Sequence, residues 1–299
     1  MVGVPAHRVA VIGDVGGHLD ELRAELRRLG ADAETGRLPD DLTVVQVGDL
    51  VHRGPASAAV IQLVDGYLRT QPAQWVQLVG NHEAQYLREP VFRWPERLDA
   101  RSARTLRRWW ADGLLRVAAW VRDDAGEEFL ITHAGLTAEF WRDTLGAPRG
   151  AERAATMLNG LIGADDGADN PALFRAGSML HRRGPVRGAG PLWACTATEL
   201  LPGWLATPLP FSQVHGHDSL FDWRKRRFRV PGDLARLTVL EDEARHETTA
   251  LDGGRIIGID PCHSGEPCGR WAAWETRTRP AQAHPPAQAP PGFGGSGIE

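Results

Sequence analysis

Residues 8–17, RVAVIGDVGG, set the pattern from which the rest of the chain can be interpreted. The apolar run Arg8–Gly13 has the length and the β-branched content of a buried strand, and Asp14 follows it directly. Glycines then lead into His18–Leu29, where leucines recur at positions 19, 22, 26 and 29, the spacing of one helical face. The chain is therefore predicted to open with a strand, a loop that begins with a carboxylate and an amphipathic helix.

The same unit returns twice farther along the chain. Thr43–Val47 is a second apolar run, which ends in Gly48-Asp49, and a helix is expected near Ala56–Leu68. Trp75–Val79 is a third run, which is closed by Gly80-Asn81-His82. Strand, loop and helix in repetition are typical of a mainly parallel sheet.

Beyond residue 84 the pattern becomes more helical before strands return. Helices are expected at Arg101–Asp112 and Ala151–Ile162, and the strand Glu128–Thr132 lies between them and ends at His133. Later strands are predicted at Phe211–Val214, Leu237–Leu240, Arg255–Ile259 and Arg270–Trp274.

One domain is expected over residues 1–275. Within it, residues 84–126 are interpreted as a helical or cap insertion, and residues 163–192, rich in Gly, Pro and Arg, as an irregular segment. Residues 276–299 are rich in Pro, Ala and Gly and have no apolar period, so they are predicted to form a disordered tail.

Composition excludes several classes of protein. The 299 residues include 38 acidic and 34 basic side chains, a net charge of −4, which argues against a nucleic-acid binder. No stretch approaches the ~18 consecutive apolar residues of a membrane-spanning helix. The three cysteines cannot form a fully paired disulfide framework, and the first residues lack the pattern of a secretory signal. A cytoplasmic location is expected.

Polar side chains follow directly on several predicted strands, and they are the candidates for chemistry. They are Asp14, Asp49, Asn81-His82, His133 and His217. Because the carboxyl ends of parallel strands face one crevice, residues that are far apart in sequence should converge there. Carboxylates, an amide oxygen and imidazoles form the mixed ligand set that suits Mn, Fe or Zn. Two such ions about 3.5–4 Å apart can clamp a phosphoryl group and activate water.

Five sequence blocks in this order resemble the calcineurin-like metallophosphoesterases. They are GDVGGHLDEL with Asp14, GDLVHRG with Asp49, GNHE at Gly80–Glu83, THAGL with His133, and VHGHD with His217. The resemblance extends from residue 8 to about residue 275, and the nearest branch looks like the bacterial relatives of Ser/Thr protein phosphatases. It implies an α/β fold in which two packed mixed β-sheets are flanked by helices, with a helical insertion.

The resemblance also implies a centre of two divalent ions. Asp49 would bridge the ions, and Asp14 would bind the first of them. The second ion would be bound by Asn81, His133 and His217. Mn²⁺ is the expected metal, although Fe, Zn and Co accept the same ligands. Below, the first site denotes Asp14, Asp49 and position 16, and the second site denotes Asp49, Asn81, His133 and His217.

The remaining roles implied by the resemblance concern the substrate. His82 would act as general acid on the leaving oxygen, and Arg53 would hold the phosphate through its guanidinium fork. The attacking species would be a metal-activated hydroxide in line with the leaving group.

The sequence departs from the family pattern at three positions. Gly16 stands where the family has a histidine ligand of the first ion, so the first site is expected to be weakened. His52 stands where the family has the Asp that orients the general acid, and the loss of that negative charge should make His82 less readily protonated. A second phosphate-binding Arg, expected after Leu192-Trp193, is replaced by Ala194-Cys195. His18, His52 and His215 are possible replacement ligands.

Other features have simpler interpretations. Cys262-His263 and Cys268 lack the spacing of a structural zinc site and are more simply part of a loop between late strands. The basic run Arg224–Arg229 is interpreted as a solvated loop, with contact to an acidic substrate as the alternative. Trp109-Trp110 is expected to pack inward from an amphipathic helix, and a cap over the site is the alternative.

The function predicted from the sequence is metal-dependent hydrolysis of a phosphoester in a phosphomonoester, phosphoprotein or nucleotide. The alternative is a weakly active or inactive relative that binds a phosphorylated ligand or a protein partner, which Gly16, His52 and the missing Arg near Cys195 favour. The expected partners are a phosphorylated small molecule or a phosphoprotein, with no membrane, and nucleic acid is disfavoured by the acidic balance.

Overall fold

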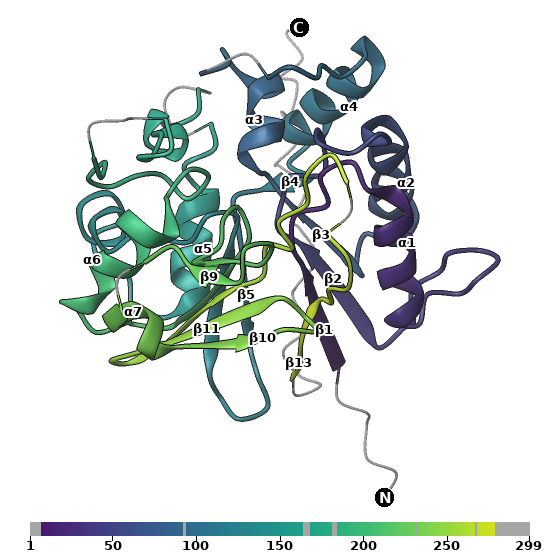
Figure 1. Cartoon of the computed structure of the whole chain (residues 1–299). Helices are drawn as coiled ribbons and strands as arrows, with labels where there is room; N and C mark the ends of the chain where they lie inside the picture. The colour runs from purple at the N-terminus through teal and green to yellow at the C-terminus, as the bar shows by residue number, and fades with distance from the viewer. Residues whose placement is uncertain are drawn as a thin grey trace, which may run out of the picture.

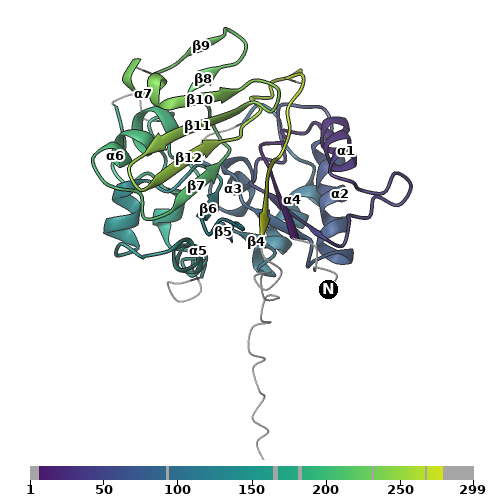
Figure 2. The same ribbon diagram turned by 90° about the horizontal axis from the view of Figure 1, so that it is seen from below.

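Two mixed β-sheets pack face to face, and helices cover their outer faces (Figure 1). This arrangement comes from a computed structural model, which describes residues 7–91, 94–163, 168–180, 184–230, 232–266 and 268–278. Figure 2 shows the two sheets from below, with α1 and α2 on one side and α5 and α6 on the other. The α/β sandwich implied by the sequence is confirmed.

The first sheet contains the strand–loop–helix units that begin the sequence. Its strand order is β13-β1-β2-β3-β4, and β1 to β4 run parallel. The strands are β1 His7–Ile12, β2 Leu42–Gln46, β3 Trp75–Leu78, β4 Leu115–Arg116 and β13 Trp274–Thr278. The helices on its outer side are α1 Leu19–Arg28, α2 Ser57–Thr70 and α4 Ala100–Ala111, and α3 Asn81–Leu87 follows β3.

The second sheet is formed by the later part of the chain. Its order is β10-β11-β12-β7-β6-β5, and β12, β7 and β6 run parallel at its centre. The strands are β5 Ala118–Arg122, β6 Glu128–Thr132, β7 Ser212–His215, β10 Thr238–Glu241, β11 His246–Leu251 and β12 Gly254–Gly258. The remaining elements are α5 Ala151–Asn159, α6 Leu201–Leu205, α7 Gly232–Leu237, the hairpin β8 Phe221–Asp222 and β9 Arg227–Phe228, and the short helices η1 Phe140–Thr144, η2 Pro171–Phe174 and η3 Thr196–Leu200.

Side-chain alternation along the strands explains why both faces of the first sheet are covered. In β1, Val9 and Val11 pack against residues of the second sheet such as Phe129 and Ile257. Ala10 and Ile12 belong to the other core, which the helices complete. Successive residues of a strand point to opposite faces, so an uninterrupted apolar strand requires a layer on each side.

The segment 84–126, expected as a helical insertion, contributes strands to both sheets. After α4 it forms β4 at the edge of the first sheet and β5 at the edge of the second. In β5, Ala118 belongs to the core beneath the helices, whereas Ala119 and Val121 belong to the core between the sheets, so the strand is covered on both faces. The segment therefore joins the two sheets, in addition to carrying helices.

The last strand lies farther along the chain than expected. Strand β13 begins at Trp274 and runs to Thr278, so it takes in three residues assigned to the tail; residues 279–299 lie outside the described part of the chain. The backbone N–H of Ala273 donates to Glu25 Oε1 at 2.6 Å, so it is not available for a strand ladder. From Trp274 onward the chain pairs antiparallel with β1, with Arg277 opposite Arg8.

None of the helices in the described ranges combines the length and the apolar content needed to cross a bilayer.

Candidate metal centre

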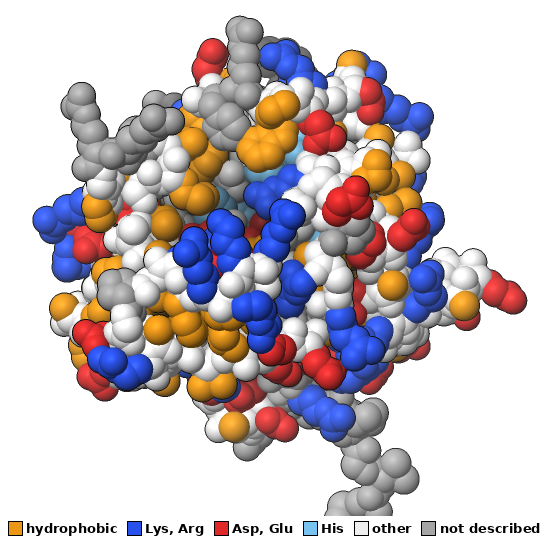
Figure 3. Space-filling view, viewed as in Figure 1, with side chains coloured by type: hydrophobic (Ala, Val, Ile, Leu, Met, Phe, Trp, Pro, Cys, Tyr) orange, Lys and Arg blue, Asp and Glu red, His pale blue; other side chains and the backbone are white. Residues whose placement is uncertain are grey.

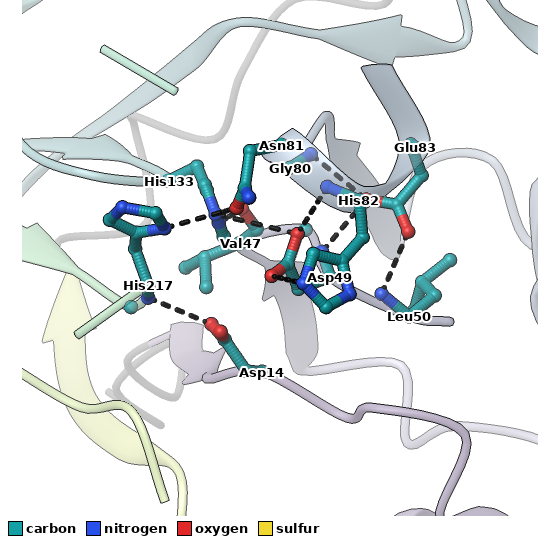
Figure 4. Close-up of polar contacts among 12 residues, drawn as sticks. Asp14, Val47, Asp49, Leu50, Gly80, Asn81, His82, Glu83, His133 and His217 are labelled. Atoms are coloured by element: carbon teal, nitrogen blue, oxygen red, sulfur yellow. Dashed lines mark hydrogen bonds and ion pairs between the residues drawn. The ribbon is translucent and has the colours of Figure 1, made fainter. Parts of the chain in front are cut away.

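The loops that follow β1, β2, β3, β6 and β7 meet at one place and bring together the predicted ligands. These are Asp14, Asp49, Asn81, His133 and His217, and Figure 4 shows their side chains directed toward one another. All five are buried. Strand direction therefore accounts for the convergence of residues that lie as far apart in sequence as Asp14 and His217.

The second site is compact. Ligand atoms of Asp49, His133 and His217 all lie within 4.8 Å of one another, and they form the one such group found among the described residues. The Asn81 amide oxygen lies 2.8 Å from His133 Nε2 and 3.0 Å from His217 Nδ1 (Figure 4). His133 Nε2 also lies 3.4 Å from Asp49 Oδ1. The four residues thus surround a single point with oxygen and nitrogen donors.

The hydrogen bonding of His133 shows why a cation suits this point. His133 Nδ1 donates to the carbonyl oxygen of Val47 at 3.1 Å, which leaves the lone pair on Nε2. That lone pair faces the oxygens of Asn81 and Asp49. Burial lowers the pKa of His133 well below its usual value, so protonation of Nε2 does not relieve the repulsion between this lone pair and the two oxygens. A divalent ion between these atoms would relieve the repulsion, and the donor set fits Mn, Fe or Zn.

Asp49 is held in place by the start of α3. Its Oδ1 accepts the backbone N–H of His82 at 2.9 Å, and its own N–H donates to Glu83 Oε2 at 2.8 Å. A Cβ at Gly80 would lie 2.2 Å from Asp49 Oδ1, so only glycine permits this approach. Burial, opposed by the His82 N–H and by Arg53, raises the pKa of Asp49 to about 7. A cation bound at Asp49 would compete with this proton.

Asp14 reaches the centre from the other side. Its Oδ1 accepts the backbone N–H of His217 at 3.0 Å, whereas Oδ2 is buried and has no hydrogen-bond partner. Burial, together with the charges of Asp260 and Asp49, raises the pKa of Asp14 well above its usual range. The orphaned oxygen is available to a cation, but Gly16 supplies no side chain to join it.

His82, the predicted general acid, is oriented by a backbone carbonyl. Its Nδ1 donates to Val51 O at 3.0 Å, and Nε2 lies 3.5 Å from Asp49 Oδ2. The pKa of His82 is lowered to about 4, first by burial and then by the charge of Arg53. The Val51 carbonyl therefore takes the orienting role that the family assigns to the carboxylate at position 52.

His52 belongs to an aromatic wall beside the centre. Tyr86 accepts the N–H of Leu98 at 3.0 Å and donates its hydroxyl proton to His52 Nε2 at 2.6 Å. The His52 ring stacks on Trp94 with a centroid distance of 5.3 Å, and the Trp94 ring lies 4.3 Å from that of His82. His52 is thus turned toward the tyrosine and lies outside the ligand group.

The other two possible replacement ligands also lie outside the ligand group. His18 Nε2 donates to the carbonyl oxygen of Ser264 at 2.9 Å, and its ring packs against His263. His215 Nδ1 donates to Gly216 O at 2.8 Å. His263, Cys262 and Cys268 form no metal-ligand group among the described residues.

Asp260 is a site residue that the strand-end argument did not select. It follows β12 as directly as His217 follows β7, so the same signal was present in the sequence. Asp260 is buried, and its charge raises the pKa of Asp14 more than the charge of Asp49 does. Its Oδ1 accepts the N–H of Cys262 at 2.8 Å. The centre therefore contains a third carboxylate.

Arg53 provides the positive charge at the centre. It lies in the loop after β2 with a left-handed backbone, φ 67°, and its Nη1 donates to His263 O at 2.8 Å. Its charge lowers the pKa of both Asp14 and Asp49. Figure 3 shows histidine side chains at the bottom of a hollow in this face, with Lys and Arg side chains beside it. Such a rim favours the approach of an anion.

The basic run Arg224–Arg229 forms the turn and second strand of the β8–β9 hairpin. Arg226 pairs with Asp242 at 2.6 Å, and Arg229 donates to Ser219 O at 3.4 Å. The run is exposed apart from Phe228, as expected for a solvated loop. Trp109 is buried and donates to Asp65 Oδ1 at 2.9 Å, so it packs inward as predicted.

Comparison with known proteins places the chain among phosphoesterases. A family model described as calcineurin-like phosphoesterase matches residues 7–230. A symmetrical bis(5′-nucleosyl)-tetraphosphatase of Yersinia pseudotuberculosis serotype O:3 is 32% identical over 163 residues, which cover 52% of this chain and 49% of that protein. An asymmetrical bis(5′-nucleosyl)-tetraphosphatase of Halalkalibacterium halodurans is 40% identical over 74 residues, covering 24% and 29%. The matched region thus spans half or less of these relatives.

Among solved structures, a cold-active protein-tyrosine phosphatase of a Shewanella species is similar at a TM-score of 0.48. Sequence identity is 17%, and the match covers 90% of this chain and 74% of that one.

Proposed function

The chain belongs to the calcineurin-like phosphoesterase family, and from this premise we propose that it hydrolyses a phosphoester with the aid of a divalent metal ion. The observation that carries the proposal is the second site, where Asp49, Asn81, His133 and His217 present their donor atoms to one buried point. Coordination there explains why these buried polar groups face one another.

A bound divalent ion would polarise a phosphoryl oxygen and lower the pKa of coordinated water. The protein's own side chains then have distinct tasks. Asp49 orients the backbone of His82 and faces its ring, while the Val51 carbonyl fixes the tautomer that leaves Nε2 without a proton. His82 Nε2 takes up a proton and delivers it to the leaving oxygen. Arg53 directs its remaining N–H groups to the phosphate.

The relatives suggest which substrates to test first. Both curated relatives are named as tetraphosphatases of nucleosides, so we propose phosphorylated nucleotides as the first class and phosphoproteins as the second. The cationic rim of the hollow suits either anion. We propose a cytoplasmic location, in keeping with the three unpaired thiols Cys195, Cys262 and Cys268. Mn²⁺ is the metal we propose to load first.

The test is hydrolysis of p-nitrophenyl phosphate by chelator-stripped protein, before and after addition of Mn²⁺. Metal-restored turnover is expected in the wild type and should be lost in His217→Ala, because that change removes a donor from the second site. His7→Ala is the matched control, since His7 lies at the opposite end of β1 and contacts Thr43. Equal rates for wild type and His217→Ala would contradict the proposal. Absence of turnover with Mn²⁺, Fe²⁺, Zn²⁺ and Co²⁺ would favour a relative that binds phosphorylated ligands.

A further inference from the structure

The first site lacks the residues that would complete a metal shell. Position 16 is a glycine with φ 52°, and a Cβ built there would lie 3.7 Å from both Arg53 Cδ and His263 Cβ. The space beside it is therefore bounded by an arginine stem and a histidine stem. Asp14 and Asp49 are the two members of the first site that carry side-chain ligands.

The three histidines nearest in sequence to these loops do not compensate. One ring nitrogen each of His18, His52 and His215 contacts another group, namely Ser264, Tyr86 and Gly216. His52 Nδ1, His215 Nε2 and His263 Nε2 are buried without a hydrogen-bond partner, but none of them belongs to the group of mutually close ligand atoms among the described residues. Among the described residues, the ligand group with mutually close donor atoms contains Asp49, His133 and His217, and Asp14 is outside it. The donor atoms are thus concentrated at the second site.

Arg53 is fixed beside the incomplete first site by the backbone. Gly54 N donates to Gly16 O at 2.7 Å, and Ala56 N donates to Gly17 O at 3.0 Å, so the loop of Arg53 is clamped to the loop of Gly16. Its Nη1 is anchored on His263 O at 2.8 Å. A guanidinium carries five N–H donors, which leaves donors for a phosphate in the hollow.

Arg53 faces the same carboxylates that a first ion would face. Asp14, Asp49 and Asp260 are 4%, 2% and 4% exposed, so none of them is screened by much solvent. Against the effect of burial, the charges of Asp260, Asp49 and Asp14 all raise the pKa of the Arg53 guanidinium. A fixed cation is therefore already in place beside the first site.

We propose that the centre holds one firmly bound divalent ion, at the second site, and that the guanidinium of Arg53 supplies the positive charge that a first ion would otherwise present to the phosphate. The inference rests on the proposed function only in taking the second site as a metal site. Asp14 then acts as a positioning residue, because its Oδ1 accepts the His217 N–H and so fixes a ligand loop.

The test is the metal content of the full chain after equilibrium dialysis against Mn²⁺, with the paramagnetic resonance spectrum of the bound Mn²⁺ as a second readout. We expect about one ion per chain and the spectrum of an isolated Mn²⁺. Asp14→Asn keeps an oxygen for the His217 N–H and should retain the ion, with affinity changed by less than about threefold, whereas His217→Ala should weaken binding by about 10–100-fold.

The outcomes separate the inference from the function on which it rests. About two ions in the wild type with an exchange-coupled spectrum, falling to one in Asp14→Asn, would overturn the inference and leave the proposed function intact. One ion that is lost in Asp14→Asn and kept in His217→Ala would also overturn it, since the ion would then belong to the first site. If the wild type binds no Mn²⁺, both the one-ion inference and the proposed metal-dependent function are contradicted. Thermal melts of each variant establish that it is folded.

The role of Arg53 has its own readout. Arg53→Met should weaken inhibition by inorganic phosphate by about tenfold or more, and Arg53→Lys should restore part of it, while both variants keep about one Mn²⁺. If Arg53→Met leaves inhibition by phosphate unchanged, Arg53 does not supply the positive charge that a first ion would present to the phosphate. A second ion in the wild type would contradict the assignment as well.

Discussion

The second site and the first site both lie on loops that follow parallel strands, yet these loops supply different side chains. On one side Asn81, His133 and His217 bring an amide oxygen and two imidazoles to within hydrogen-bond distance. On the other, Asp14 meets Gly16, Arg53 and a further carboxylate, Asp260. The ends of parallel strands bring residues together at both sites, and the one-ion proposal attributes the difference between the sites to the residue at position 16.

The change with the largest expected effect breaks both sites together. Asp49 faces His133 and His82 and belongs to each ligand set, so Asp49→Asn should lower metal-dependent turnover by about a thousandfold or more. The measurement is p-nitrophenyl phosphate hydrolysis with Mn²⁺, with a thermal melt to confirm folding. A rate near that of the wild type would overturn the assignment of Asp49.

A smaller effect is expected from His82, whose ring faces Asp49. His82→Ala should slow an alkyl phosphate by about a hundredfold and p-nitrophenyl phosphate far less, because nitrophenolate leaves without a proton. Initial rates on the two substrates, measured with the same Mn²⁺-loaded protein, give the ratio. Equal losses on both would remove His82 from the acid role.

The comparison can be sharpened by restoring the missing imidazole. Gly16→His should cost about 1–2 kcal/mol of stability, because φ 52° is unfavourable for a side chain. Neighbouring atoms at 3.7 Å leave room for the Cβ, so the variant should gain more stability from Mn²⁺ than the wild type does.

Gly16→Ala is the matched control for that experiment, since it carries the same backbone strain without a ligand. Equal stabilisation of the two variants by Mn²⁺ would show that an imidazole at position 16 does not reach the first site.

The smallest predicted effect is the pH dependence of metal-free stability. Burial raises the pKa of Asp49 to about 7 and that of Glu83 to about 8, above the unfolded values near 4. Such carboxyls bind a proton more tightly in the folded state, so their contribution is fully present below pH ~4 and is lost as pH rises through these values. Between pH ~7.5 and 9 the chelated protein should therefore lose about 0.5–1 kcal/mol.

Urea unfolding of the chelated protein across that range is the measurement. The histidines of the centre have lowered pKa values, so near pH ~6.5, where the unfolded chain still binds protons on its histidines, they oppose the trend. Above pH ~7.5 they are essentially neutral in both states, so the carboxyls determine the slope there. Stability that rises with pH would contradict the burial of neutral carboxyls.

The sequence was sufficient to predict the ligand residues that directly follow strands and their convergence at one place. Asp14, Asp49 and His133 follow apolar runs that are strands, and their convergence follows from parallel pairing. Strand β5 was missed because its short apolar run has no alternating pattern and lies between segments with helical periodicity. Asp260 was missed because the late strands were assigned from short apolar runs, without the strand-end argument.

Other features of the centre depend on contacts that no local pattern records. His82 Nδ1 donates to the Val51 carbonyl, which does what the family's carboxylate at position 52 would do. This contact involves the backbone and forms only in the folded chain. The left-handed backbone of Asp49, His52, Arg53 and His217 is imposed on residues that rarely adopt it. These conformations are maintained by the surrounding hydrogen bonds, such as those that the backbone N–H groups of Asp49 and Leu50 donate to Glu83.

The pairing of β13 with β1 has a consequence for how the chain folds. Strand β1 is synthesised before the other strands described here, yet its edge partner is complete only when Thr278 has been made. Until then β1, whose core residues are all apolar, presents an unpaired edge that can pair with other chains. Closing so long a loop is slow, so the docking of β13 should be a late event in folding. Nascent chains should accordingly depend on chaperones until synthesis has passed this strand.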